Sequence, residues 1–323
     1  MGENQGLRPL TVGLHGYEDS ANSNQTGDIL RHSAERRDSL RSALLGGCGK
    51  ERQRLSELLG NYSESPFAVL SDAFPHGFVP IPSVPHSLWA SVTAENRKTI
   101  KAKRWLPADQ VTLPLNKWQA AAADDKEAGL LRESSVTSHN SINRVTGTTG
   151  EGAFAPFQSI VTAFANGVTL DLYAVIDEDR FTESDLLESL TAIGTAGFGR
   201  DASTGLGKFE VIGSEEMPAS AQTESWLTLA DSSLRGMGAD EARSFYKPRA
   251  HFGRFGNYRA LTGTPFKKPV LLAETGAVIT FAEPRAFPFI GRAVTGVSPV
   301  WTDAVMQGYA PVLPLAPIAL EDL

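Results

Sequence analysis

The segment best suited to hold a ligand is a glycine-rich stretch, residues 194–207, followed by Lys208. Glycine lets the main chain come close to a phosphate group, where backbone amides, hydroxyls and cations can donate hydrogen bonds. Arg200, Ser203, Thr204 and Lys208 add such donors. The stretch therefore predicts a backbone-built surface for nucleic acid. A simple glycine-rich turn is the structural alternative.

Two nucleotide-binding motifs can be compared with the same stretch. A P-loop needs Gly-Lys-Ser/Thr, but Phe209 follows Gly207 and Lys208, and Ala202 stands where the first glycine belongs. Residues 197–202 match the letters of a dinucleotide fingerprint, which needs a strand before it and a helix after it. Here we expect a helix before and a strand after. A nucleotide-binding enzyme stays as a third hypothesis.

Three further clusters could contact nucleic acid. Cations beside aromatic rings can pair with phosphates and stack on bases, and amides and hydroxyls at an exposed tip can donate to RNA. The first cluster is Lys101, Lys103 and Arg104 beside Trp105; the second is Arg249, His251 and Arg254 among Phe252, Phe255 and Tyr258; the third is His139, Asn140, Asn143, Arg144 and Thr146. For the first two, a solvated basic face beside core aromatics is the alternative.

Composition narrows the class of protein. Lysine and arginine number 30 against 37 acidic residues, a net charge of −7, so bulk charge does not attract nucleic acid and any site must be a local patch. The single cysteine, Cys48, excludes a disulfide framework within the chain and a thiolate-rich metal site. The six histidines show no metal-binding spacing. We find no membrane span or signal peptide and expect a cytoplasmic protein.

The elements that must position these clusters follow from hydrophobic spacing. We expect a strand over 10–14, a helix over 38–60, a proline-rich surface loop over 67–85, a short helix over 118–128 and an exposed hairpin over 134–154. A buried strand over 168–176, a helix beginning at Thr182 with a capping box to Asp185, and a strand over 208–212 follow. This β-α-β-β-α-β order is ferredoxin-like. Short strands then occur at 226–230, 269–274, 277–281 and 311–315.

The glycine-rich stretch, from Gly197 to Phe209, resembles the signature loop of the CRISPR-associated RAMP superfamily. Within it, the chain is most similar to subunit four of the type III-A Csm interference complex. Supporting segments occur in family order: 38–44, 71–75 with Pro80 and Pro82, 139–147, 265–269 and 308–310. The N-terminal region departs from the family: Arg36 and Arg37 precede Asp38, where the family has a His-Ser pair.

This resemblance implies an α+β fold of two tandem ferredoxin-like domains, residues 1–213 and 214–323, with a projecting hairpin thumb near 134–154. It implies a non-catalytic subunit that holds the 5′ repeat-derived tag of the CRISPR RNA (crRNA) and docks the large polymerase-like subunit. An adjacent RAMP backbone subunit and, indirectly, target RNA are the other partners; no cofactor or metal is expected. The implied RNA-binding residues are the three clusters above, Arg36, Arg37, Gly197, Gly199, Arg200, Ser203, Thr204, Gly205, Gly207 and Lys208.

The alternative is a RAMP endoribonuclease that processes precursor crRNA. Metal-independent RNA cleavage needs a histidine or similar group near the 2′-hydroxyl. His32, His139 and His251 are the candidates.

Overall fold

The structure is a computed structural model. It describes residues 7–16, 54, 57–198, 202, 205–217, 221–255, 259, 262–302 and 304–318. The N-terminal half contains a four-stranded antiparallel sheet in the order β2-β7-β1-β8. Its strands are β1 (Leu7–Gly16), β2 (Ala68–Pro75), β7 (Thr169–Asp177) and β8 (Phe209–Glu216). The two central strands, β1 and β7, are thus neighbours in the sheet although they are more than 150 residues apart in the sequence.

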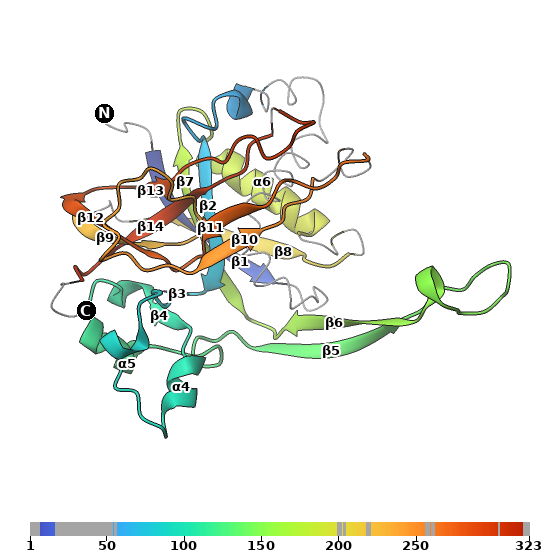
Figure 1. Cartoon of the computed structure of the whole chain (residues 1–323), viewed down its shortest axis with the longest axis horizontal. Coiled ribbons are helices and arrows are strands. Elements are labelled where there is room, and N and C mark those ends of the chain that lie inside the picture. Colours follow the sequence, from blue (N-terminus) through green and yellow to red (C-terminus); the bar gives the residue numbers. More distant parts are fainter. Residues whose placement is uncertain are drawn as a thin grey trace.

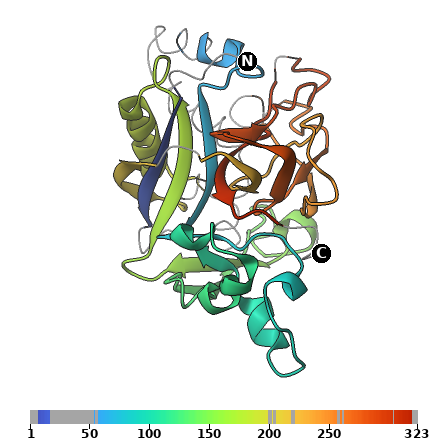
Figure 2. The same ribbon diagram turned by 90° about the vertical axis from the view of Figure 1, so that its left-hand side faces the viewer.

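Helix α6 (Glu183–Ala196) connects β7 to β8 and covers one face of this sheet (Figures 1 and 2). It begins at the predicted capping box, in which Thr182 and Asp185 each accept a hydrogen bond from the other's backbone amide. Its buried residues include Leu186 and Leu190, which join the core formed with β1, β2 and β7. The local sequence signals at this helix are confirmed.

Strand β7 lies inside the sheet and is buried on both faces. Leu172 packs in the core under α6, whereas Tyr173 packs in a second core with Leu227 and Leu229 of the C-terminal half. Burial on both faces explains the near-continuous apolar run and confirms the predicted central strand.

The prediction of a surface loop over 67–85 is wrong for residues 68–75. All eight residues of β2 are buried, although β2 is at the edge of its sheet. The C-terminal half covers that edge, and the backbone amide of Asp72 donates to the carbonyl of Leu229 at 2.8 Å. The only proline in the strand, Pro75, ends it, so the prolines interrupt only the segment after residue 75.

The C-terminal half is a second antiparallel sheet in the order β12-β9-β14-β13. Its strands are β9 (Thr223–Thr228), β12 (Val278–Arg285), β13 (Phe289–Gly291) and β14 (Tyr309–Leu315), and beside them lies the pair β10 (Pro248–His251) and β11 (Val270–Ala273). Figure 2 shows the two four-stranded sheets side by side, with α6 on the outer side of the first. No α-helix follows α6 in the described part of this half. The expected α+β class is confirmed, and the sheets are antiparallel.

Residues 76–130 form an insert below the two sheets (Figure 1). It contains β3 (Phe78–Pro80), α4 (Arg97–Ala102), β4 (Trp105–Pro107) and α5 (Leu115–Ala121), with short 3₁₀ turns at His86–Leu88 and Ala108–Gln110. A further 3₁₀ turn, Gly152–Phe154, lies outside the insert. Trp89, Ile100, Leu106 and Trp118 give the insert a core that is continuous with the C-terminal half. The helix expected at 118–128 ends at Ala121, where the next residue is extended.

An antiparallel hairpin of β5 (Arg132–His139) and β6 (Phe157–Phe164) projects from the body (Figure 1). Every described residue of β5 after Arg132 is exposed. The strands begin closer to the body than the sequence suggested, and the turn between them covers residues 140–156. Within the described ranges, no helix is long and apolar enough to cross a membrane.

Candidate nucleic-acid interface

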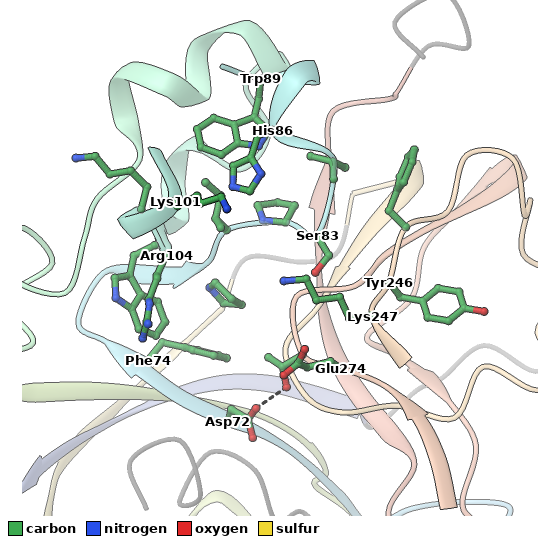
Figure 3. A pocket seen from close by; sticks show the side chains of 18 of the residues that line it. Asp72, Phe74, Ser83, His86, Trp89, Lys101, Arg104, Tyr246, Lys247 and Glu274 are labelled. Atoms are coloured by element: carbon green, nitrogen blue, oxygen red, sulfur yellow. Dashed lines mark hydrogen bonds between the residues drawn. The ribbon is translucent and has the colours of Figure 1, made fainter. Parts of the chain in front are cut away.

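A cavity of about 810 Å³ opens where β2, the insert, the hairpin base and the C-terminal half meet. Among the residues that the structure describes, six cations and three carboxylates line it, an excess of positive charge in a chain of net charge −7. Figure 3 shows Lys101 and Arg104 on one side and Lys247 on the other, with Asp72 and Glu274 in the lower part of the view. The charged lining residues are Lys101, Lys103, Arg104, Arg132, Lys247, Arg249, Asp72, Asp231 and Glu274.

Of the described carboxylates that line this cavity, Asp231 is the best shielded from water, with its side chain 3% exposed. Burial raises its pKa, and the charge of Arg249, 2.9 Å away, acts in the opposite direction. The amide of Thr275 also donates to Asp231 at 3.0 Å, and the hydroxyl of Thr275 donates to Asp72 of β2. The ion pair with Asp231 therefore holds the Arg249 side chain in place where it lines the cavity.

The predicted cluster at residues 101–105 lies on the insert side of the cavity. Lys103 pairs with Glu127 and lowers the pKa of that carboxyl. Arg104 is 3.9 Å from Asp125 and its side chain is 62% exposed, whereas the indole N–H of Trp105 donates to Asp125 at 2.8 Å. Trp105 also packs edge-on against Phe74, so its ring is partly held within the protein. Lys101 and Arg104 are the freely accessible cations of this cluster.

Sequence reasoning missed two cavity cations, Arg132 and Lys247. Arg132 begins β5 and donates to Asp125 at 2.5 Å, so it links the hairpin base to the insert. Lys247 is exposed immediately before β10. For Lys247, the only signal is the absence of any acidic residue between Glu241 and Glu274, a pattern visible in the sequence.

The described part of the glycine-rich stretch forms a closely packed base. Gly197 ends α6 with φ of 90°, and the amide of Phe198 donates to the carbonyl of Gly207 at 2.9 Å. A Cβ on Gly207 would lie 2.0 Å from the carbonyl oxygen of Phe198, so only glycine fits there. Gly205 has φ of 90° and open space around it, and Lys208 is exposed. None of these residues lines the cavity.

The turn at the far end of the hairpin is stabilised by hydrogen bonds between its own residues. It contains the predicted residues Asn140, Asn143, Arg144 and Thr146. The Asn143 side chain accepts a hydrogen bond from the Val145 amide at 2.9 Å, and the Gly147 amide donates to the Asn143 carbonyl. His139 stacks on Phe157 with ring centroids 5.0 Å apart and lies 2.8 Å from the Ser159 hydroxyl.

The predicted cluster at 249–254 is divided between inside and outside. His251 is buried at 4% exposure, which removes its side chain from any surface of this chain. Arg254 is exposed, with its guanidinium 5.8 Å from the ring centroid of Phe266.

Several predicted residues lie outside the described residues: Arg36, Arg37, Gly199, Arg200, Ser203 and Thr204, together with the nuclease candidate His32. Across the described ranges, no group of three histidine, cysteine, aspartate or glutamate side chains could hold a metal ion.

Comparison with known proteins finds matches to the fold of this chain but none to its sequence. No family model and no curated protein matches the chain. Among solved structures, the Csm3–Csm4 subcomplex of the type III-A CRISPR-Cas interference complex contains a chain that matches with a TM-score of 0.57 at 13% identity, covering 96% of this chain and 100% of that one. The Csm1–Csm4 cassette matches with a TM-score of 0.55 with cA4 bound, at 11% identity, and 0.53 with AMPPNP bound, at 12% identity, with the same coverage.

The fold is therefore that of a subunit of type III-A CRISPR interference complexes, as the resemblance to the RAMP superfamily predicts. Csm4 is the component that these structures have in common, so the chain is Csm4-like in fold over almost its whole length. At 11–13% identity this likeness concerns the fold.

Proposed function

We propose that this protein is a non-catalytic RNA-binding subunit of a type III CRISPR effector complex, which caps the 5′ repeat-derived tag of the crRNA. The observation that carries the proposal is the cavity, where cations from three separate parts of an acidic chain converge. Phosphate contacts of this kind fix the register of a bound strand. Csm3 and Csm1 accompany Csm4 in structures that share the fold, which supports an adjacent backbone subunit and a large polymerase-like subunit as partners, with target RNA contacted indirectly.

The first domain in this proposal is ferredoxin-like. The order β2-β7-β1-β8 is the antiparallel order that a β-α-β-β-α-β chain produces when its first and third strands lie in the centre. We place the end of this domain after Glu216, not at residue 213, because β8 continues to pair with β1 up to that residue. The second domain has the different order β12-β9-β14-β13, so its relation to the ferredoxin-like plan is more distant.

Three surfaces share the RNA in this proposal. The cavity holds tag phosphates through Lys101, Arg104 and Lys247, the glycine-rich stretch offers backbone donors, and the hairpin acts as a thumb beside the junction of tag and guide. This division is based on the lining of the cavity, to which neither the described part of the glycine-rich stretch nor the hairpin tip contributes.

No observation in the described residues supports the endoribonuclease hypothesis or the nucleotide-binding hypothesis. Of the histidines proposed for cleavage, His251 is buried, His139 is on the exposed hairpin, and neither lines the cavity. The glycine-rich stretch follows helix α6 and precedes strand β8, the reverse of the dinucleotide-binding arrangement.

The test is to purify the tagged full chain from its host and sequence the bound RNA with its 5′ ends preserved. We expect short RNAs that share one repeat-derived 5′ segment and differ after it. RNA of random sequence, or none, would contradict the proposal.

A matched pair of variants locates the tag site. Lys101→Glu with Arg104→Glu reverses two cavity cations, whereas Lys98→Glu with Lys117→Glu reverses two exposed cations of the same insert outside the cavity. The net charge change is identical. We expect the first pair to lose the tagged RNA and the second pair to keep it.

A further inference from the structure

One stretch of the chain has a charge unlike the rest. Between residues 242 and 273 there are seven lysines and arginines and no aspartate or glutamate, in a chain of net charge −7. Most of this stretch is the ribbon, which we define as residues 248–255 and 262–273. The ribbon contains β10, β11 and the backbone pairing that extends them, in which the Lys267 amide donates to the Gly253 carbonyl at 2.7 Å (Figure 1).

The outgoing strand of the ribbon has one buried and one exposed side. Ala250, Phe252 and Arg254 are exposed, and the residues between and after them, His251, Gly253 and Phe255, are buried. This period of two is that of a strand with one face on the protein and one face toward solvent. Phe252, at 70% exposure, is thus presented outward by the register of the strand.

The returning strand presents a second aromatic ring on the exposed surface. His251 pairs with Val270 and Arg254 with Phe266, so the returning strand has one extra residue between the pairs, as in a β-bulge. The bulge leaves both Lys268 and Pro269 exposed. Phe266 is 67% exposed and Leu271 70%.

Aromatic rings and cations share this exposed face. The Arg254 guanidinium lies 5.8 Å from the Phe266 ring centroid. In the part of the chain that the structure describes, no carboxylate pairs with Arg254, Lys268 or Lys247. Beneath the face, Lys267 lies 5.1 Å from the ring centroid of Phe255 and adds positive charge. Exposed rings next to available cations are the means by which proteins bind single-stranded nucleic acid.

The ribbon continues directly from the cavity. Tyr246, Lys247 and Arg249 line the cavity, and the chain continues through β10 to Phe252 and to Arg254, which forms a β-bridge with Phe266. A strand of RNA that leaves the cavity on this side would meet the exposed face next. The lack of any acidic residue favours a polyanion over a protein surface as the occupant.

We propose that the exposed face of the ribbon binds single-stranded RNA, with bases stacked on Phe252 and Phe266 and phosphates paired with Arg254 and Lys268. This inference extends the proposed function by a second RNA surface. It rests on that function only in the chemical class of the ligand, because stacking on a ring requires no particular sequence.

The test uses the purified full chain and a fluorescein-labelled oligouridylate of about 15 nucleotides, which is within the usual site size for single strands. Phe252→Ala with Phe266→Ala should weaken binding about tenfold or more, since loss of one stacked base costs about 1–3 kcal/mol. Ile212→Ala with Val300→Ala, which removes two other exposed apolar side chains, should change it less than about twofold. Arg254→Ala with Lys268→Ala should also reduce the slope of log affinity against log salt by about 0.7 for each phosphate that is no longer neutralised.

Crosslinking of the wild-type chain to oligouridylate substituted with thiouridine gives a second readout that does not depend on a variant folding. We expect crosslinked peptides from residues 250–271. Unchanged affinity in the phenylalanine variant, or crosslinks only elsewhere, would overturn the inference. It would also be overturned if that variant kept RNA affinity but lost another subunit of the complex, since the face would then be a protein interface.

The same data separate this inference from the proposed function. If the wild type shows no preference for tag RNA over oligouridylate but the phenylalanine variant still weakens oligouridylate binding, the ribbon holds RNA and the tag proposal fails. If the preference for tag RNA depends on Lys101 and Arg104 but the phenylalanine variant binds oligouridylate normally, the tag proposal stands and the ribbon inference fails.

Discussion

The cavity and the hairpin tip are built in opposite ways. In the cavity, Arg249 is paired with a carboxylate, Asp231, that is 3% exposed, and Lys103 is paired with Glu127. At the hairpin tip, Arg144 is exposed and has no ion pair among the described residues, and the turn is held by short-range hydrogen bonds such as that from Val145 to Asn143.

This difference separates folding from binding. A cation fixed by a buried carboxylate is already oriented for a ligand, but removing it leaves a charge without its partner inside the protein. A cation on an exposed hairpin can be removed without any such cost. Substitution of Arg249 in the cavity should therefore change both stability and RNA binding, whereas substitutions at the tip should change binding alone.

The largest effect is expected for Arg249→Ala. It leaves Asp231 buried with only the hydrogen bonds from Thr275, and we expect the free energy of unfolding to fall by about 2–3 kcal/mol. Urea denaturation measures this. Adding Asp231→Asn removes the uncompensated charge and should restore most of the stability. If Arg249→Ala unfolds at the wild-type urea concentration, the buried pair does not hold the cavity wall.

A smaller effect on stability, together with a loss of RNA binding, is expected for Gly205→Asp. Gly205 and Gly167 both have positive φ and open space for a side chain, so aspartate costs about 1–2 kcal/mol of backbone strain at either position. Only Gly205 belongs to the glycine-rich stretch. We expect Gly205→Asp to weaken tag RNA binding at least tenfold relative to Gly167→Asp, in the turn between β6 and β7, by adding a negative charge beside the RNA.

Fluorescence anisotropy with tag RNA measures both glycine variants, and their thermal midpoints should fall by similar amounts. Equal binding by the two would show that the glycine-rich stretch is a structural turn.

The contrast between local and distant contacts also decides what the sequence could predict. Helix α6 and strand β7 follow from local signals, the capping box at Thr182 and an unbroken apolar run. The cavity joins Asp72 to Thr275, which are 203 residues apart, and no spacing rule relates such positions. Lys101 and Arg104 could be named as cations near aromatic rings, but their convergence with Lys247 could not.

Burial misled the interpretation in two places. Prolines after residue 75 suggested that the whole of 67–85 was a loop, whereas β2 is buried along its whole length, packed partly in the core of the N-terminal half and bonded through Asp72 to the C-terminal half. His251 resembled its exposed neighbour Phe252 as a ring among cations, but strand alternation turns it inward. In both cases tertiary packing, and not local propensity, decided the outcome.

At the hairpin tip, Arg144→Ala should weaken tag RNA binding about threefold to tenfold and leave the free energy of unfolding within about 0.5 kcal/mol of the wild type. Lys126→Ala removes an exposed cation outside both regions and controls for net charge. Anisotropy titrations and urea denaturation test the two halves of this statement. A clear loss of stability in Arg144→Ala would remove the distinction between tip and cavity.

The smallest effect expected is a pH dependence at His76, which combines features of both regions. Its side chain is 75% exposed, as residues at the tip are, but the side chain of its partner Asp171, 2.9 Å away, is only 7% exposed, as Asp231 of the cavity is. The hydrogen bond and the charge of Asp171 raise the pKa of His76.

The protonated form of His76 is thus favoured by folding. Its contribution is complete below the unfolded-state pKa of about 6.5 and is lost as the pH rises through the raised pKa of the folded state. We expect the stability difference between wild type and His76→Gln to shrink by less than about 1 kcal/mol from about pH 6 to about pH 8.5, because solvent screens an exposed pair. Urea denaturation of both proteins at several pH values measures it. A larger change would mean that the burial of Asp171 sets the strength of this pair more than the exposure of His76 does. The stability effects of cations at the tip and in the cavity would then depend on whether the cation has a buried partner, and not on how exposed the cation itself is.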